Sequence, residues 1–199
     1  MRRAALVAVM LALTGPLRVF AEGPPPLPTL KSGRAHITEE VKSGGKVWVT
    51  ALFWVDADQE ATFRILRDIE RHPEFMPQVR ATRILSAGQG YHVVHIEAGE
   101  GVLASAYTLR RTWDATRRIS WTLVEGRPRE VTGFWEVARP SEGGGSLVTY
   151  SAYINIGGLV PDFVTRYVVK QTVPVMVTNV RKRAESGGVW QSDEYRHRQ

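Results

Sequence analysis

Few residues in this chain have the types and spacing that metal or thiol chemistry requires. His92 and His95 are three positions apart in a predicted strand, so their side chains leave opposite faces and cannot easily share a metal. His95 and Glu97 do share a face, but one imidazole and one carboxylate are too few ligands for a stable site. The sequence has no cysteine, which excludes disulfides, thiolate nucleophiles and cysteine-ligated metals. We therefore expect no metal and no cofactor, and we expect these polar side chains to face solvent.

Acid–base chemistry, such as that of a cyclase or an aldolase, would need a titratable group that points into an apolar interior. Strand alternation offers Tyr107, Arg111 and Tyr150 for this role, and the last predicted helix offers Tyr167. A buried tyrosine hydroxyl more often serves as a hydrogen-bonding handle than as a catalyst. The chain also lacks the nucleophile-elbow, phosphate-loop, zinc-protease and dinucleotide-binding motifs. We expect no catalytic residue, and we expect these side chains to orient a guest rather than to convert it.

Arg111 is the charged residue on an otherwise apolar strand face, which it shares with Tyr107, Leu109 and Trp113. A buried arginine needs an internal partner or an anionic guest, because an unpaired charge is costly away from water. The alternative is an arginine near a strand end that extends its guanidinium to solvent. For an arginine at such a position, the second arrangement is the more common one.

The stretch DIERHPEFMP, from Asp68 to Pro77, places Phe75 and Met76 in a short segment between two prolines. Loops are usually polar because they run over the protein surface. Apolar side chains here indicate either one wall of an apolar binding space, to which a flexible methionine is suited, or ordinary packing against the core. Both residues are candidates for contact with an apolar ligand.

The elements that must position these residues follow from hydrophobic periodicity. KVWVTALFWV, residues Lys46–Val55, is a predicted strand rich in β-branched and aromatic residues. A helix follows, capped by Asp56 or Asp58 and ended by Pro73. From there the period changes to two, and six more strands are predicted at Val79–Ala87, Tyr91–Ala98, Leu103–Trp113, Arg118–Val124, Gly133–Ala138 and Leu147–Asn155.

The last element is predicted to be one long helix over residues 162–186, with Pro161 at its start. Pro174 should kink this helix, and its many valines leave two shorter helices as an alternative. The order of elements and the short, turn-like links predict an α+β fold with one antiparallel sheet of seven strands. The C-terminal helix must cover one face of that sheet. A curved sheet over a helix leaves a space between the two.

Alternation along the strands indicates which side chains face that space. Apolar positions alternate with polar ones in each strand, so the apolar set points inward. Two aromatic residues of the last helix are expected at the same space, because that helix covers the sheet. The predicted ligand-binding residues are Phe75, Met76, Ile96, Tyr107, Arg111, Trp121, Trp135, Tyr150, Phe163 and Tyr167.

Residues 1–21 have the three-part layout of a secretory signal. A basic start precedes an apolar run that is too short to span a bilayer, and Val19-Phe20-Ala21 fits the small-residue cleavage pattern. Cleavage near Ala21 would make the protein periplasmic or secreted and would lower its formal net charge from +6 to +3. The alternative is an uncleaved N-terminal anchor. A mild basic excess does not indicate nucleic-acid binding, which normally needs a concentrated basic face.

The rest of the chain divides by composition. Residues 22–45 are predicted to be a linker rich in proline and glycine, in which the prolines favour an extended polyproline II conformation. Residues 46–185 are long enough for one core and form the single predicted domain. Gly187 and Gly188 open a polar tail over residues 186–199.

The segment VDADQEATFRILRDIERHPEFMPQVRATRIL resembles the opening of START-like, or SRPBCC, domains, and most closely those of the polyketide cyclase and coenzyme Q-binding subgroups. In these domains a strand ends in v-A-x-x-e-x-v-f-x-v-l-x-D, and x-E-x-x-P-x-F-x-P-x-v follows. The matching residues are Val55, Ala57, Glu60, Phe63, Leu66, Asp68, Glu70, Pro73, Phe75, Pro77 and Val79. A later segment resembles the family's last hairpin and the start of its last helix, through Gly133, Trp135, Pro140, Gly145, Val148, Tyr150 and Pro161.

This resemblance covers about Lys46 to Ala184 and implies a helix-grip fold, in which a curved antiparallel sheet wraps over a long C-terminal helix. It also implies a deep apolar cavity, which many members use for lipids, sterols, quinones or polyketides. The expected function is therefore binding and transport of a hydrophobic small molecule. The alternatives are a polyketide cyclase or dehydratase and a protein-binding module that uses the same groove. The expected partners are that small molecule and, transiently, a membrane surface.

Overall fold

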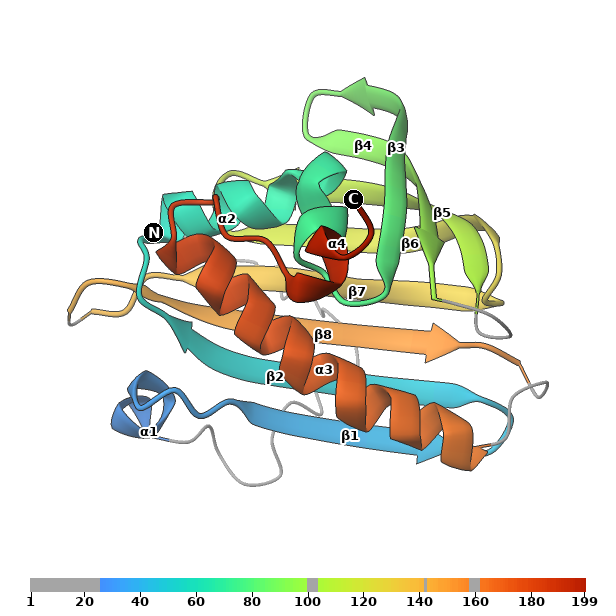
Figure 1. The fold of residues 1–199 in the computed structure, drawn as a ribbon, viewed down its shortest axis with the longest axis horizontal. Helices are drawn as coiled ribbons and strands as arrows, with labels where there is room; N and C mark the ends of the chain where they lie inside the picture. The colour runs from blue at the N-terminus through green and yellow to red at the C-terminus, as the bar shows by residue number, and fades with distance from the viewer. Residues whose placement is uncertain (1–25, 100–103, 142, 158–161) are drawn as a thin grey trace, which may run out of the picture.

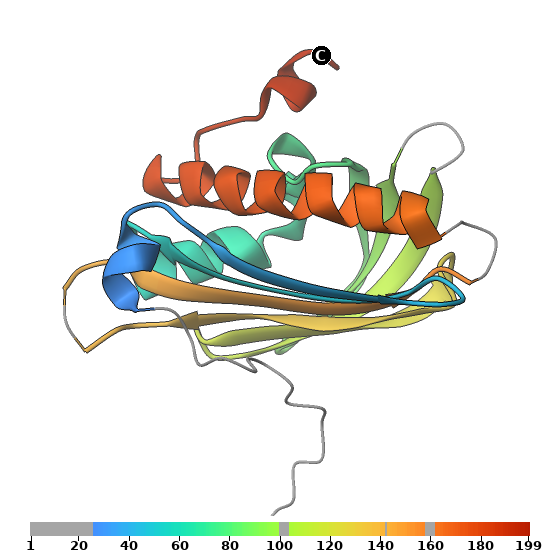
Figure 2. The same cartoon turned by 90° about the horizontal axis from the view of Figure 1, so that it is seen from below.

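A computed structural model describes residues 26–99, 104–141, 143–157 and 162–199, apart from the side chains of residues 162–168. The predicted signal segment 1–21 lies outside the described residues. The fold is α+β, with one curved antiparallel sheet whose eight strands run in the order β1-β2-β8-β7-β6-β5-β4-β3. The long C-terminal helix α3, Asp162–Glu185, crosses the concave side of this sheet, and two shorter helices, α2 (Gln59–Arg67) and η1 (Ile69–Glu74), lie beside it (Figures 1 and 2).

All seven predicted strands are present, with ends that differ by a few residues. The eighth lies upstream of them, so the predicted strand count was too low by one. β2 pairs with β8, which brings the beginning and the end of the sheet-forming chain together. The strands are β1 His36–Lys42, β2 Lys46–Val55, β3 Val79–Gly88, β4 Tyr91–Ala98, β5 Ser105–Asp114, β6 Arg118–Gly126, β7 Glu130–Ala138 and β8 Ser146–Asn155.

Strand β1 lies in the segment that was predicted to be a linker. It pairs with β2 along its whole length, from His36 opposite Leu52 to Lys42 opposite Lys46. Its sequence, HITEEVK, is mostly polar because an edge strand with one solvated face buries little, and this hides the pattern from which strands are predicted. The turn between the two strands needs Gly45, whose φ is 75° and where a Cβ would lie 2.4 Å from the backbone oxygen of Gly157.

The proline-rich stretch before β1 also differs from the prediction. Residues Leu27–Lys31 form the short helix α1, which has a proline in its first turn, where the missing N–H is not needed. Leu30 of α1 is buried against Leu52 and Trp54. Over Leu27–Lys31, a helix that covers part of the outer face of the sheet therefore stands in place of the predicted extended conformation.

Helix α2, Gln59–Arg67, begins at Asp58, whose side chain accepts a hydrogen bond of 2.7 Å from the backbone N–H of Ala61. This identifies which of the two candidate aspartates is the cap. The 3-10 helix η1, Ile69–Glu74, follows directly and contains Pro73. The two elements place the end of α2 over the sheet.

Helix α3, Asp162–Glu185, is a single helix of 24 residues, so the alternative of two shorter helices is wrong. It packs on β2, β1 and α2. Pro174 lies on its exposed side, where water can satisfy the carbonyl that proline leaves without a donor. The buried side of the helix carries Val173, Met176, Val177, Val180 and Ala184.

The polar tail is tied to the body of the protein. The backbone N–H of Ser192 donates to the oxygen of Glu74 at 2.9 Å, and the Arg198 guanidinium donates to the backbone oxygens of Pro73 and Val79. A short helix, α4, spans Asp193–Arg196. The C-terminal segment thus lies on the far side of α3 from the sheet and holds η1 in place (Figure 2).

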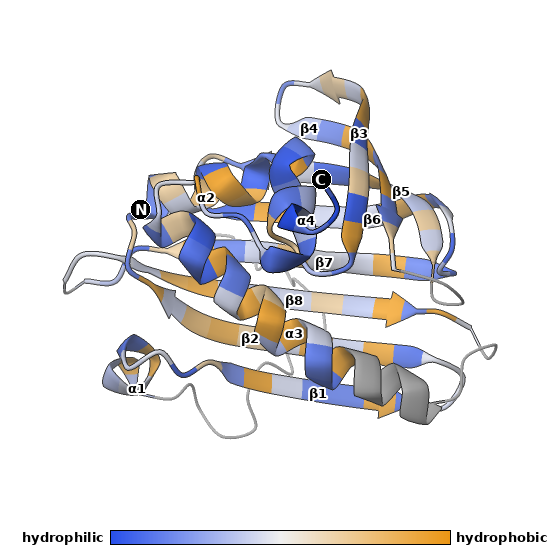
Figure 3. Ribbon diagram, viewed as in Figure 1, coloured by the Kyte–Doolittle hydropathy of each residue, from blue (hydrophilic) through white to orange (hydrophobic). Residues whose placement is uncertain are grey.

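The core lies between the concave face of the sheet and the helices. Polar and apolar residues largely alternate along β7 (Figure 3), as a strand with one solvated face requires, whereas Ala51–Val55 of β2 is an apolar run that is buried on both faces. The fully buried side chains come from both layers and include Phe53, Phe63, Leu66, Ile119, Val137, Val148 and Val180.

Candidate functional site

The core is not filled throughout, because a cavity of about 580 Å³ lies between the concave face of the sheet and α3. Its wall is mostly apolar and takes residues from β2 to β8, from η1 and from α3. Seven residues predicted from the sequence to face a ligand line this cavity. They are Met76, Ile96, Tyr107, Arg111, Trp121, Trp135 and Tyr150.

The other three predicted residues are not among those placed at the cavity wall. Phe163 and Tyr167 fall among the residues whose side chains are not described. Phe75 is fully buried, but it packs edge-on against His72, with ring centroids 5.4 Å apart, and lies under the guanidinium of Arg183. Phe75 and Met76 follow η1 directly and point in different directions, so that only Met76 reaches the cavity.

Three aromatic rings from the centre of the sheet form the floor of the cavity. The ring centroid of Tyr150 lies 4.5 Å from that of Trp135 and 5.9 Å from that of Trp121. Gly133 makes room for this cluster, since a Cβ there would come within 2.6 Å of the Trp121 ring. The strands therefore present a broad aromatic surface to any guest in the cavity.

Arg111 lies at the inner end of the cavity and is only 2% exposed. Its guanidinium donates to the backbone oxygens of Leu66 at 2.7 Å and Arg67 at 3.1 Å. These are the last carbonyls of α2, where the helix dipole favours a cation. The alternative in which Arg111 extends to solvent is therefore wrong. Burial lowers the pKa of Arg111 to about 10, so the side chain remains a cation at neutral pH.

His72 lies beside Arg111 and also lines the cavity. Its Nε2 is 3.1 Å from the Leu66 oxygen, the same atom to which Arg111 donates. Burial, aided by the charges of Arg111 and Arg183, lowers the pKa of His72 to about 3. The imidazole is therefore neutral at physiological pH. Together the two side chains form a polar end to an otherwise apolar cavity.

The phenol groups of Tyr107 and Tyr150 also face the cavity. Burial raises the pKa of Tyr107 to about 12, and burial together with Tyr107 raises the pKa of Tyr150 further. Both hydroxyls stay protonated at neutral pH, so they can donate hydrogen bonds but cannot act as phenolate bases.

The exposed residues of the wall mark where the cavity opens. Gln78, Ala104 and Arg127 line it and are exposed, and they lie near the ends of β3, β5 and β6. Along β5, the inward side chains lead from Ser105 at this opening to Arg111 at the inner end, a length of roughly 20 Å for an extended strand. The cavity thus has an open end and a polar inner end.

His72 was not among the residues predicted from the sequence, although it lies in the same segment, Asp68–Pro77, as Phe75 and Met76. The alternation of side chains that shows which strand residues point inward does not apply to a 3-10 helix. A single histidine also forms no pattern with its neighbours from which the direction of its ring could be predicted. The neighbouring prolines did indicate an unusual segment. His72 was identifiable only once the carbonyl of Leu66 and the guanidinium of Arg111 were both placed.

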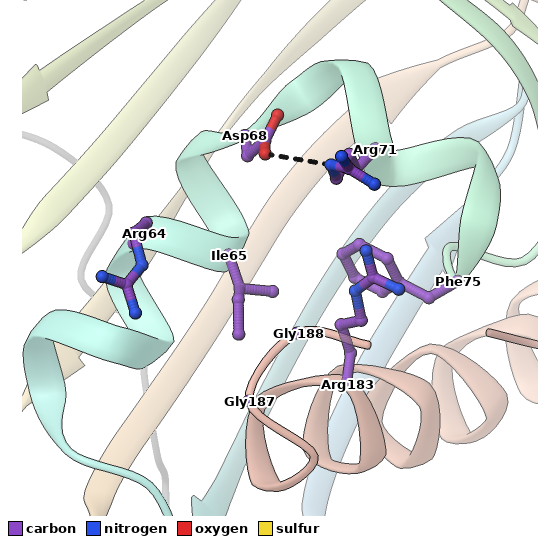
Figure 4. Close-up of a pocket in the computed structure, with 8 residues that line it drawn as sticks. All are labelled: Arg64, Ile65, Asp68, Arg71, Phe75, Arg183, Gly187 and Gly188. Carbon is purple, nitrogen blue, oxygen red and sulfur yellow. Dashed lines mark ion pairs between the residues drawn. The ribbon is translucent and has the colours of Figure 1, made fainter. Parts of the chain in front are cut away.

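A second, smaller cleft of about 160 Å³ lies between the α2–η1 segment and the end of α3 (Figure 4). Asp68, Arg71 and Arg183 in its wall form ion pairs. Arg71 lies 3.8 Å from the carboxylate of Asp68 and 3.0 Å from that of Glu74, and Arg183 lies 2.8 Å from Glu74. Since Phe75 also contributes to its wall, we interpret this cleft as the seam where the C-terminal end of α3 meets η1.

Of the two strand histidines, only His95 lies apart from these sites, because His92 is paired directly with Arg111 across β4 and β5 and so shares its face of the sheet. His95 is on the outer face, with Nδ1 3.4 Å from the hydroxyl of Thr108, whereas the ring of His92 packs edge-on against Trp113 at 4.6 Å. Across the described ranges, no group of three or more potential ligands could hold a metal ion. None of the helices in those ranges is both long and apolar enough to span a membrane.

Comparison with curated proteins shows distant relatives. The chain is 24% identical to the persistence and stress-resistance toxin PasT of Escherichia coli O6:H1 over 87 residues, which are 44% of this chain and 54% of PasT. It is 26% identical to the ribosome association toxin RatA of Pseudomonas aeruginosa over 76 residues, 38% of this chain and 53% of RatA. The chain thus spans about half the length of the curated relatives it matches.

Solved structures share the fold over most of their length. A STAR-related lipid transfer protein from Xanthomonas axonopodis superposes with a TM-score of 0.64 at 16% identity, over 75% of this chain and 93% of that one. The Zhui aromatase/cyclase from Streptomyces sp. R1128 superposes with a TM-score of 0.58 at 18% identity, over 76% and 94%. At these identities the likeness concerns the fold.

A protein family also matches this sequence over one long, continuous segment. Residues 55–181, from the end of β2 to the last turns of α3, match the family described as polyketide cyclase / dehydrase and lipid transport. This segment contains most of the cavity wall, including the aromatic floor and the polar end formed by His72 and Arg111. With more than half of its length matched, this chain belongs to the polyketide cyclase / dehydrase and lipid transport family.

Proposed function

We propose that the protein binds a hydrophobic small molecule, such as a lipid, an isoprenoid or a quinone-like compound, in the cavity under α3 and carries it. The observation that carries this proposal is the cavity of about 580 Å³ with an aromatic floor. A space of this size deprives the surrounding side chains of contacts when it is empty, and an apolar guest restores them.

The carrier function is favoured over a cyclase or dehydratase because the titratable groups at the cavity are poorly matched to proton transfer. Efficient acid–base catalysis needs a pKa near the working pH. His72, with a pKa of about 3, is too weak a base, and Tyr107, with a pKa of about 12, is too weak an acid. These groups suit orientation of a guest by hydrogen bonds.

Export and membrane contact complete the proposal. The signal-like layout of residues 1–21 supports a periplasmic or secreted location. An insoluble ligand must enter from another apolar phase, which supports transient contact between the open end of the cavity and a membrane surface. Nucleic acid is not a proposed partner.

Native mass spectrometry of protein purified without detergent tests this function. We expect an adduct of lipid mass that leaves on denaturation, and we expect the adduct to be weak or absent in Ala152→Phe, in which a ring fills part of the cavity. Incubation with polyketide-like substrates tests the alternative. Multiple turnover that disappears in Arg111→Ala would assign the protein to the enzymes instead.

A further inference from the structure

The polar end of the cavity has a defined pattern of hydrogen-bond donors and acceptors. A carbonyl oxygen can only accept, so the contact between His72 and the Leu66 oxygen assigns the proton to Nε2. The other ring nitrogen, Nδ1, then carries a lone pair. No hydrogen-bond partner for this atom occurs among the described residues. On a residue that lines the cavity, Nδ1 is an acceptor available to a guest.

Arg111 supplies the complementary donors. Its two bonds to the end of α2 occupy two of the five N–H groups of a guanidinium. Because Arg111 and His72 both contact the oxygen of Leu66, the remaining N–H groups lie within a few ångströms of the imidazole. A guest group at this end therefore meets a cationic donor and a neutral acceptor side by side.

A hydroxyl group matches this pair. Its proton can go to Nδ1 of His72, while a lone pair of the same oxygen accepts from Arg111. An ether or ester oxygen can accept from Arg111 but leaves Nδ1 without a donor, and an unmatched buried polar atom is costly. A carboxylate attracts the cation but turns its own lone pairs toward that of Nδ1.

We propose that the inner end of the cavity recognises the hydroxyl head group of an apolar alcohol or phenol, through donation from the ligand hydroxyl to His72 Nδ1 and from Arg111 to the hydroxyl oxygen. The inference rests on the proposed function, because it names the ligand class of that same cavity. The low pKa of His72, about 3, supports it, since the ring keeps its acceptor over the physiological pH range.

Three ligands with the same alkyl chain isolate the head group. 1-Dodecanol, its methyl ether and dodecanoate are each titrated at pH 7.5 against the neutral fluorescent probe N-phenyl-1-naphthylamine bound to the wild type. We expect 1-dodecanol to displace the probe with about tenfold higher affinity than the ether. We also expect dodecanoate to bind more weakly than the alcohol, with uptake of a proton that calorimetry in two buffers detects.

Two histidine variants give matched controls. In His72→Gln, the amide nitrogen can keep the bond to the Leu66 oxygen, but the acceptor that remains, the amide oxygen, no longer occupies the position of Nδ1. We therefore expect the alcohol-over-ether preference to fall severalfold. In His95→Gln, the same substitution lies on the outer face of the sheet, and we expect the preference to remain. The wild-type ligand series tests the proposal even if His72→Gln does not fold.

The outcomes separate the two levels of the proposal. Equal affinities of the wild type for 1-dodecanol and its ether would overturn the hydroxyl inference and leave the carrier function standing. Dodecanoate binding as tightly as the alcohol without proton uptake would also overturn it, since the site would then be an anion site. Failure of every ligand, and of the probe itself, to bind would overturn the proposed carrier function.

Discussion

Replacing Ala152 with phenylalanine tests whether the space under α3 is a true cavity. Ala152 lies in β8, is 4% exposed and lines the cavity. An engineered cavity of about 150 Å³ holds one benzene, so the new ring would take roughly a quarter of the 580 Å³. Because the ring enters open space, we expect the free energy of unfolding to change by about 1 kcal/mol or less, below the 1–3 kcal/mol typical of an overpacked core.

The same substitution should remove most of the ligand affinity. If the ring displaces three or four methylene groups of a bound chain, at about 0.8 kcal/mol each, binding weakens by about 3 kcal/mol, or roughly a hundredfold. A ligand at about 100 times its Kd stabilises the wild type by about 2.7 kcal/mol. This raises the melting temperature by roughly 5–10 °C for a protein of this size. In Ala152→Phe the same ligand concentration should give a shift of only about 1 °C.

Ala51 provides the matched control, because it lies in the neighbouring strand β2, opposite Tyr150, and is fully buried without lining the cavity. Ala51→Phe should lower the free energy of unfolding by about 1–3 kcal/mol or more, because the new ring would overpack a filled part of the core. Thermal unfolding of the three proteins is measured with and without a panel of fatty acids, phospholipids, sterols and quinones. The reasoning is refuted if Ala152→Phe is as unstable as Ala51→Phe and no ligand shifts the melting temperature of the wild type.

Four further predictions concern the C-terminal seam, pH dependence and export. Glu74→Gln should lower the free energy of unfolding, measured by urea denaturation, by about 3 kcal/mol, because the guanidinium of Arg183, which is 2% exposed, loses its carboxylate partner. An unchanged urea midpoint would contradict a structural role for this ion pair. Burial holds the pKa of His72 at about 3 against an ordinary 6.5, so only the unfolded chain gains a proton between these pH values and stability falls as pH falls. Between pH 6.5 and pH 4, the free energy of unfolding of the wild type should fall by about 3 kcal/mol more than that of His72→Gln. If the free energies of the two proteins change in parallel with pH, the buried imidazole is not held neutral. Deletion of residues 187–199 should loosen η1 and accelerate ligand dissociation several-fold in stopped-flow displacement, whereas an unchanged rate would limit the tail to a role in stability. Intact-mass analysis of the periplasmic fraction should give a mature protein that begins at Glu22, and a full-length mass would refute signal cleavage.

The face of the sheet to which each strand residue points is encoded directly in the local sequence. Trp121, Trp135 and Tyr150 were predicted to face inward because side chains alternate between the two faces of a strand, and the structure places all three on the cavity floor. The long C-terminal helix was equally predictable, since its buried side repeats at helical spacing. β1 was not predicted, because an edge strand with one solvated face has almost no alternation of apolar and polar residues.

Tertiary contacts determine the directions in which the two adjacent side chains after η1 point. Phe75 and Met76 have similar hydropathy and no strand parity to separate them, yet only Met76 reaches the cavity. Phe75 turns instead toward Arg183 of α3. The direction of each side chain is set by the docking of η1 against the C-terminal end of α3, which no local pattern describes.

The sequence by itself determined the α+β class, seven of the eight strands, the long helix and the inward aromatic residues, because these follow from the period of short segments. The tertiary structure alone decided the fate of Arg111, which the sequence left between solvent and an internal partner. Its partners are carbonyl groups at the end of α2, more than forty residues earlier in the chain. It also decided that His72 shares the oxygen of Leu66 with Arg111 and that the space under α3 stays open. Such features depend on how distant backbone groups and side-chain volumes meet, and these long-range contacts are not encoded in the periodicity of any one segment.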